Sequence, residues 1–272
     1  MGTWDNWINQ PRQTSAVIDP TQAQKLQVTL NREPDLTDGD LLPPAWHWLY
    51  FHELAKASDI GRDGHTRLGI SMPDFPLPRR MWAGGKIHWQ HPVRLGESAQ
   101  KISKIIEITE KQGRTGSLIF MTVEHLVIQS ETKCIREEQN IVYRQEAVET
   151  SNVEPERAAI ESSFSQSWQL TEVDLFRYSA LTFNSHRIHY DSDYVRDIEG
   201  YSGLIVHGPL LATLMLDLAY QQGRDFNEFT YRAKSPVMLP SSFTVHGLVD
   251  DSSTNLWVAN QNGALAMTGK LS

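Results

Sequence analysis

The chain has 272 residues, 40 % of them hydrophobic, and a formal net charge of −8 at pH 7. A chain of this length can bury a full core as one large domain or two small ones. Its negative charge of mixed sign argues against a nucleic-acid-binding protein, which would present a basic face. The single cysteine, Cys134, excludes a disulfide framework and a thiolate metal cluster, and it fits a reducing compartment.

The N-terminal segment is polar and lacks the apolar core of a signal peptide. The longest apolar stretches are too short to span a bilayer. We therefore expect a cytoplasmic protein with no membrane or nucleic-acid partner.

The first predicted helix covers residues 42–56. Two prolines suit its start, and Trp46, Leu49, Tyr50 and Leu54 fall near one face at helical spacing. We interpret these apolar side chains as core rather than as a cofactor pocket.

Residues 61–85 are rich in Gly, Pro and Arg, which predicts a long loop of the kind that often binds ligands. Arg79 and Arg80 lie in it. They are either anion-binding residues or a solvated basic pair.

Residues 86–146 have the β-branched runs of antiparallel strands, with turns at 111–116 and 130–133. The polar, acidic segment 146–160 is the best candidate for a linker. A strand follows at 163–170.

The second half contains two predicted helices. One begins at Thr171, an N-cap residue, with Asp174 placed to complete a capping arrangement. The other is strongly apolar, covers Pro209–Gln222 and ends at Gly223. Strands and turns are predicted from there to the end.

One short pattern occurs twice. Pro-Val-x-Leu appears at 92–95 and again at 236–239, each time between predicted strands. Each half also has a predicted helix followed by strands. This shared order of elements indicates an ancient duplication.

The stretch 179–191, "SALTFNSHRIHYD", contains the densest cluster of chemically useful side chains. His186, His189 and the later His207, with Asp191, are a possible zinc site. The competing interpretation, which spacing alone favours over the metal site, is that they are ordinary hydrogen-bonded histidines. The third interpretation is proton transfer, because imidazole titrates near neutral pH.

The downstream segment "VHGPLL" supports proton transfer. Gly208 precedes Pro209 at the start of the apolar helix, where a glycine lets a ligand approach the backbone closely. A backbone N–H at a helix N-terminus can stabilise a developing negative oxygen. Together with a histidine, such a donor is suited to enolate chemistry.

These two segments, "YSALTFNSHRIHYD" and "GLIVHGPLL", resemble the R-specific enoyl-CoA hydratases of the MaoC-like group in the hotdog superfamily. The signature of that family is Ser-Gly-Asp-x-Asn-Pro-(Ile/Leu)-His followed by His-Gly. By this resemblance His189 corresponds to the catalytic histidine, Asn184 to the catalytic aspartate, and Gly208 to the glycine of the oxyanion hole.

The whole chain is similar to the two-hotdog hydratases that act on mesaconyl-CoA and itaconyl-CoA. The resemblance implies an α+β double hotdog, with two antiparallel sheets each wrapped around a central helix. Residues 1–148 would form an N-terminal hotdog that lacks the motif, and 149–272 a C-terminal hotdog that carries it. It implies hydration to citramalyl-CoA in itaconate or related acid catabolism, with no metal and no cofactor beyond the CoA of the substrate. A homodimer is compatible with this resemblance.

The sequence departs from the family at the acid–base pair, because Asn184 cannot accept a proton from water at neutral pH. Either His189 is the sole base and Asn184 positions the water, or another carboxylate such as Asp191 contributes; Asp191 is also suited to be a helix N-cap. We expect Arg187 to bind a substrate carboxylate, with Arg79 and Arg80 as alternatives, and Tyr190 and His207 to contact substrate. A dehydratase of fatty-acid synthesis, a thioesterase and a non-catalytic acyl-thioester-binding protein remain as alternative functions.

Overall fold

A computed structural model describes residues 3–113, 116–145, 154–250 and 253–272. Ten strands form one antiparallel sheet in the order β1-β3-β4-β5-β2-β7-β10-β9-β8-β6. The strands are β1 (Arg12–Val17), β2 (Arg79–Trp89), β3 (Ser98–Gly113), β4 (Gly116–Gln129), β5 (Thr132–Arg144), β6 (Phe164–Gln169), β7 (Glu228–Ala233), β8 (Ser242–Asp250), β9 (Ser253–Asn260) and β10 (Leu265–Leu271).

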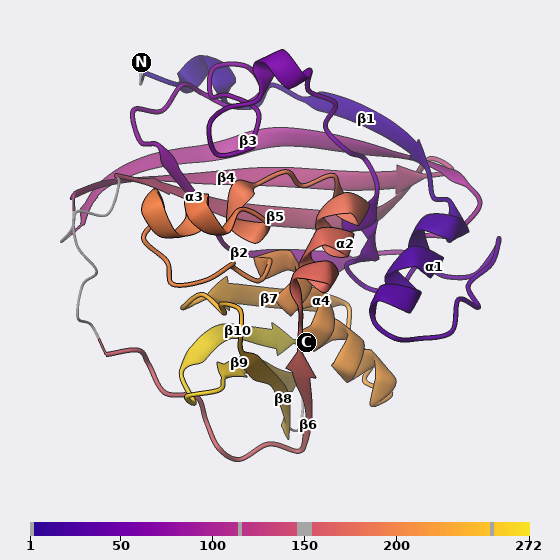
Figure 1. The fold of residues 1–272 in the computed structure, drawn as a ribbon. Coiled ribbons are helices and arrows are strands. Elements are labelled where there is room, and N and C mark those ends of the chain that lie inside the picture. The colour runs from indigo at the N-terminus through magenta and orange to yellow at the C-terminus, as the bar shows by residue number, and fades with distance from the viewer. Residues whose placement is uncertain (1–2, 114–115, 146–153, 251–252) are drawn as a thin grey trace.

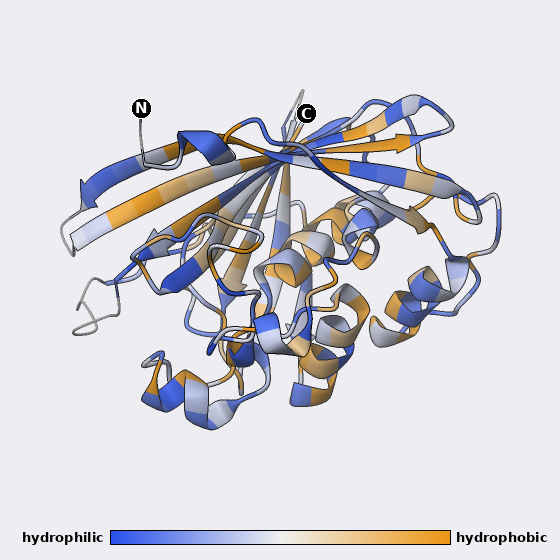
Figure 2. Cartoon of the chain, turned by 90° about the horizontal axis from the view of Figure 1, so that it is seen from above, coloured by the Kyte–Doolittle hydropathy of each residue, from blue (hydrophilic) through white to orange (hydrophobic). Residues whose placement is uncertain are grey.

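The helices lie together on the inner side of the curved sheet (Figures 1 and 2). They are α1 (Pro20–Thr29), α2 (Glu172–Thr182), α3 (Ser192–Asp197) and α4 (Gly208–Gln221), with 3₁₀ turns η1 (Asp5–Trp7), η2 (Trp46–Leu49), η3 (Ala57–Asp59) and η4 (Arg187–His189). No helix in the described part of the chain is long and apolar enough to cross a membrane.

The sheet consists of two halves with matching strand order. The order β1-β3-β4-β5-β2 in the first half corresponds to β6-β8-β9-β10-β7 in the second, read from the outer edge inward. The halves join where β2 pairs with β7, in a register that sets Gly84 opposite Arg232 and His88 opposite Glu228. The two Pro-Val-x-Leu segments each follow one of these seam strands. This equivalence agrees with the predicted duplication.

The second half has the long central helix. α4 packs against β8, β9 and β10, and its residues from Leu210 to Ala219 are buried. The predicted helix Pro209–Gln222 is therefore confirmed within one residue at each end. The capping arrangement of α2 is also confirmed, because the Thr171 N–H donates to the Asp174 carboxylate over 2.8 Å.

The predicted helix at 42–56 is wrong. Only η2 is helical there, because Ala45 and Phe51 on either side of it have left-handed φ angles of 65° and 58°, which interrupt helical hydrogen bonding. Trp46 and Leu49 are buried as predicted, but Leu54 is 86 % exposed. In the order of elements, η2 occupies the place that α4 has in the second half.

The helix of the first half that packs against α2 is α1, which was not predicted. The Asp19 carboxylate accepts a hydrogen bond from the Thr21 N–H, and Pro20 is the first helical residue. An Asp-Pro pair is a recognised start signal for a helix. Its apolar pattern is too weak to predict a helix by periodicity.

The remaining predictions concern strands and the linker. The turn at 130–133 is confirmed, since β4 ends at Gln129 and β5 starts at Thr132. β6 confirms the strand at 163–170. The long loop ends earlier than predicted, so Arg79 and Arg80 begin strand β2. Residues 146–153 of the predicted linker, and the predicted domain boundary within them, lie outside the described residues.

The seam between the halves requires glycine. A Cβ atom on Gly85 would lie 2.3 Å from the Glu138 carbonyl oxygen and 2.4 Å from the Tyr231 hydroxyl. We expect Gly85→Ala to lower the free energy of unfolding by about 2 kcal/mol, the usual cost of overpacking. Thr230→Ala, an exposed position on β7 at the same seam, should change it by less than about 0.5 kcal/mol. Urea denaturation measures both, and equal effects would contradict the packing argument.

Candidate active site

A cavity of about 320 Å³ lies at the seam and is lined by both halves of the chain. The second half contributes the motif segment and the start of α4, and the first half contributes strand β2 and a loop before it. The lining residues that matter below are His65, Arg80, Trp82, Asn184, His189 and Gly208. The structure thus brings together the three residues to which the family resemblance assigns catalysis.

The orientation of His189 is fixed by one hydrogen bond. Its Nδ1–H donates to the Ile205 carbonyl oxygen over 2.7 Å. Because a carbonyl only accepts, Nδ1 carries the proton and Nε2 of the neutral ring is left as an acceptor. Burial lowers the pKa of His189 to about 4. The ring is therefore a neutral base at pH 7.

His207 lies behind His189 and does not line the cavity, contrary to the predicted substrate contact. It is fully buried, and its ring stacks on that of His189 with 3.6 Å between centroids. Its Nε2 is 2.8 Å from the Ser179 hydroxyl. Burial holds the pKa of His207 well below its usual value. A neutral ring at this place packs against the His189 imidazole without adding charge.

Gly208 is the first residue of α4, and its neighbour makes glycine necessary. A Cβ atom there would lie 2.7 Å from Cε3 of Trp82 on β2. The first N–H groups of a helix have no acceptor within the helix and sit at the positive end of its dipole. Gly208 therefore offers a backbone donor to the cavity.

Asn184 follows Phe183, whose left-handed φ of 52° ends α2. Its Oδ1 accepts a hydrogen bond from the His186 N–H over 3.0 Å. The NH₂ group is then the part of the amide available to a ligand. Such a group can hold the oxygen of a water molecule but cannot take its proton.

Arg187 and Tyr190 lie outside the cavity, which corrects their predicted contact with substrate. Arg187 pairs instead with Asp191 over 2.7 Å. The Tyr190 hydroxyl donates to the Ser185 carbonyl oxygen over 3.1 Å, and this side chain is half exposed. Asp191 caps α3 by accepting from the Tyr194 N–H over 2.9 Å, so its carboxylate is fully engaged.

The two arginines of β2 differ in their partners. Arg79 is buried and pairs with the Glu199 carboxylate over 2.7 Å. Arg80 is half-buried and lines the cavity, and it pairs with no carboxylate of the described residues. Arg80 is thus the free cation of the site within the described part of the chain.

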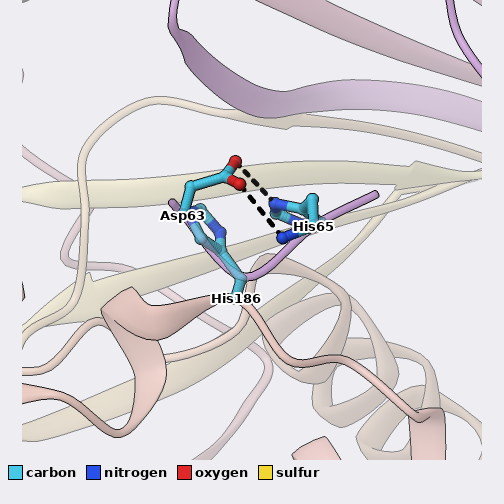
Figure 3. A group of neighbouring side chains, drawn as sticks. All are labelled: Asp63, His65 and His186. Carbon is cyan, nitrogen blue, oxygen red and sulfur yellow. Dashed lines mark hydrogen bonds and ion pairs between the residues drawn. The ribbon is translucent and has the colours of Figure 1, made fainter. Parts of the chain in front are cut away.

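Sequence reasoning missed Asp63 and His65. His65 Nδ1 and its backbone N–H both donate to the Asp63 carboxylate, each over 3.0 Å. Figure 3 shows this pair facing His186, whose ring centroid is 4.2 Å from that of His65. The available signal was an Asp and a His two residues apart, in a loop already predicted to bind ligands.

A model of the hydroxyacyl-thioester dehydratase type 2 family matches residues 45–239. The chain belongs to this family. It is 38 % identical over 97 % of its length to mesaconyl-C(4)-CoA hydratase of Chloroflexus aurantiacus, of which it covers 96 %. It is 27 % identical to mitochondrial hydroxyacyl-thioester dehydratase type 2 of Schizosaccharomyces pombe, over 80 % of each chain. The predicted MaoC-like membership is confirmed.

Solved structures share the fold. A MaoC-like dehydratase from Phytophthora capsici superposes with a TM-score of 0.72 at 13 % identity, covering 99 % of this chain and 97 % of that one. A Mycobacterium tuberculosis protein described as a double hotdog gives 0.62 at 9 % identity, covering 96 % and 94 %. The α+β double hotdog is therefore confirmed, with its two sheets joined edge to edge.

The site predicts a measurable protonation state. We expect ¹⁵N NMR to show His189 as the neutral Nδ1–H tautomer at pH 7, titrating near pH 4, since burial lowers its pKa to about 4. The pKa of a histidine in the unfolded chain is about 6.5, so the unfolded chain binds this proton more readily than the folded chain does. The contribution of His189 to stability is therefore lost as the pH falls from about 6.5 to about 4. An imidazolium at pH 6 would contradict this assignment.

Proposed function

We propose that this protein is a hydro-lyase that adds water to the double bond of an enoyl-CoA. One observation carries the proposal: a neutral imidazole, His189, and a helix N-terminal donor, Gly208, line the same cavity. The first removes a proton from water, and the second stabilises the enolate that the addition creates. The family and the 38 % identical hydratase support this assignment.

Gly208 binds the thioester carbonyl. Attack of water at the β-carbon moves negative charge onto that oxygen, which accepts the Gly208 N–H at the positive end of α4. A preorganised donor of this type stabilises the transition state by roughly 3–4 kcal/mol. The Trp82 ring packed on Gly208 keeps the donor in place.

His189 acts on the water. Its Nε2 accepts the proton, because Nδ1–H is held by the Ile205 carbonyl. The Asn184 NH₂ group holds the water oxygen. The proton is then returned to the α-carbon, so that the neutral imidazole is restored and no net charge is left in the buried site.

The substrate we propose is a branched dicarboxylic enoyl-CoA. In the substrate named for the Chloroflexus relative, the carbon β to the thioester bears a free carboxylate. Arg80 is suited to bind it, since Arg pairs with carboxylates through two parallel hydrogen bonds. Mesaconyl-CoA would give citramalyl-CoA directly. Itaconyl-CoA would first need its double bond moved into conjugation, which the same base and oxyanion donor can promote.

The second candidate is dehydration of 3-hydroxyacyl thioesters in fatty-acid synthesis. The names of the matching family and of the yeast relative favour it. It uses the same residues in the reverse direction, and it needs no cation beside the acyl chain. A panel of enoyl-CoA esters with and without a distal carboxylate separates the two functions.

We expect His189→Gln to lower kcat for enoyl-CoA hydration at least about 100-fold, because general base catalysis contributes roughly 10²- to 10⁴-fold. Loss of the conjugated enoyl-thioester absorbance measures the rate. His246→Gln, on β8 with its ring stacked on Trp257, is the matched control and should retain full activity. More than a tenth of normal turnover in His189→Gln would remove His189 from this role.

Arg80→Ala should selectively impair carboxylated substrates. A lost charged hydrogen bond of about 2 kcal/mol lowers kcat/KM for mesaconyl-C(4)-CoA roughly 30-fold, with little change for crotonyl-CoA. Arg187→Ala, which removes an arginine outside the cavity, should affect both substrates equally. Equal losses on both substrates in Arg80→Ala would exclude the carboxylate contact.

A further inference from the structure

The proposed site lacks the second base of the family's acid–base pair. The attacking water has two protons, and the His189 Nε2 accepts one of them. Where the family has a carboxylate, this chain has Asn184, whose Oδ1 is already bonded to the His186 N–H. An amide can hydrogen-bond the water, but it cannot take its proton at neutral pH. A second acceptor for the water must come from elsewhere in the cavity wall.

His65 supplies such an acceptor. It lines the same cavity, and its Nδ1–H is committed to the Asp63 carboxylate. The neutral ring therefore has Nε2 as its one nitrogen available to a ligand. Burial first, and then the nearby Arg80 cation, lower the pKa of His65 to about 4, although Asp63 opposes this shift. The ring is an acceptor at neutral pH.

The loop that carries His65 is fixed to the catalytic segment. The Arg187 N–H donates to the Asp63 carbonyl oxygen over 2.8 Å, and the Arg187 Nη1 donates to the Arg62 carbonyl oxygen over 3.0 Å. A Cβ atom on Gly64 would lie 1.9 Å from the Ser185 carbonyl oxygen. The glycine lets the two backbones touch. Arg187 thus fastens His65 to the motif that contains His189.

We propose that His65, oriented by Asp63, is a second acid–base residue of the hydratase site and replaces the carboxylate that Asn184 lacks. This rests on the proposed function. The water donates one hydrogen to each imidazole and lies between them. As its oxygen bonds to the β-carbon, the π electrons move toward the thioester and one O–H bond breaks. Nε2 of His189 takes that proton and returns it to the α-carbon. Nε2 of His65 accepts the hydrogen bond of the other O–H and polarises the water, and the Asp63 carboxylate offsets the positive charge that develops on the His65 ring.

A metal site is the competing use of this cluster. One ligand atom each of Asp63, His65 and His186 lie within 4.8 Å of one another. However, the Asp63 carboxylate already accepts two N–H groups of His65. Burial first, and then the positive charge of Arg80, lower the pKa of His65. Burial and the neighbouring histidines His65 and His189 lower the pKa of His186, and the Arg80 charge adds to this shift. That charge opposes a second cation, so the cluster favours proton transfer.

The test compares His65→Gln and Asp63→Asn with the wild type on mesaconyl-C(4)-CoA and crotonyl-CoA. We expect kcat to fall about 100-fold for His65→Gln and at least tenfold for Asp63→Asn. KM, and the Kd of a saturated acyl-CoA measured by calorimetry, should stay within threefold. Asp63→Asn preserves the shape of the pair, and so tests the charge should His65→Gln fail to fold.

His125→Gln is the matched control. Its ring lies on β4 outside the cavity, bonded to the Ser103 hydroxyl, and burial also lowers the pKa of His125 to about 4. This variant should keep wild-type kcat. Unchanged kcat in His65→Gln, a loss confined to KM and Kd, or activity that zinc restores after chelation would each overturn the proposal. A wild type that hydrates neither ester would instead refute the proposed function.

Discussion

The pairing of β2 with β7 is the constraint on which the site depends. It joins the two half-sheets into one, and it places the Trp82 ring of the first half against Gly208 of the second. Close contact there requires glycine on both sides, at Gly85 within the seam and at Gly208 on the helix. The cavity is therefore a product of the joined sheet, because neither half encloses it alone.

Burial then sets the chemistry of the histidines. His65, His186, His189 and His207 follow one another in ring contact, with centroids 4.2, 5.5 and 3.6 Å apart. Burial lowers the pKa of each, and proximity makes a charge on one disfavour a charge on the next. The four imidazole rings are therefore uncharged before the reaction. This row is suited to receive one proton from water and to release it again.

Part of the cavity wall could be predicted from the sequence. His189, Asn184 and Gly208 all line the cavity, and they could be found because they lie in two short segments of recognisable pattern. Arg187 and Tyr190 were misplaced, because neighbours of His189 in sequence point to different sides of the short 3₁₀ turn η4. His207 was misplaced because its ring stacks behind that of His189, away from the cavity. Arg80 and His65 reach the site from the first half through the seam, and pairing between distant strands has no local signal. The failed helix at 42–56 has the correct apolar spacing, but spacing does not show that Ala45 and Phe51 adopt left-handed backbone.

The first half reaches the site of the second through a long connection that contains no α-helix. In the second half the connection from α4 to β7 covers only residues 222–227, whereas in the first half the connection from η2 to β2 runs from 50 to 78. A connection as short as 222–227 stays close to the core of its own half. The long one extends to the motif segment, where Gly64 allows backbone contact and Arg187 holds it. The first half thereby places His65 at the cavity, beside the motif residues of the second half.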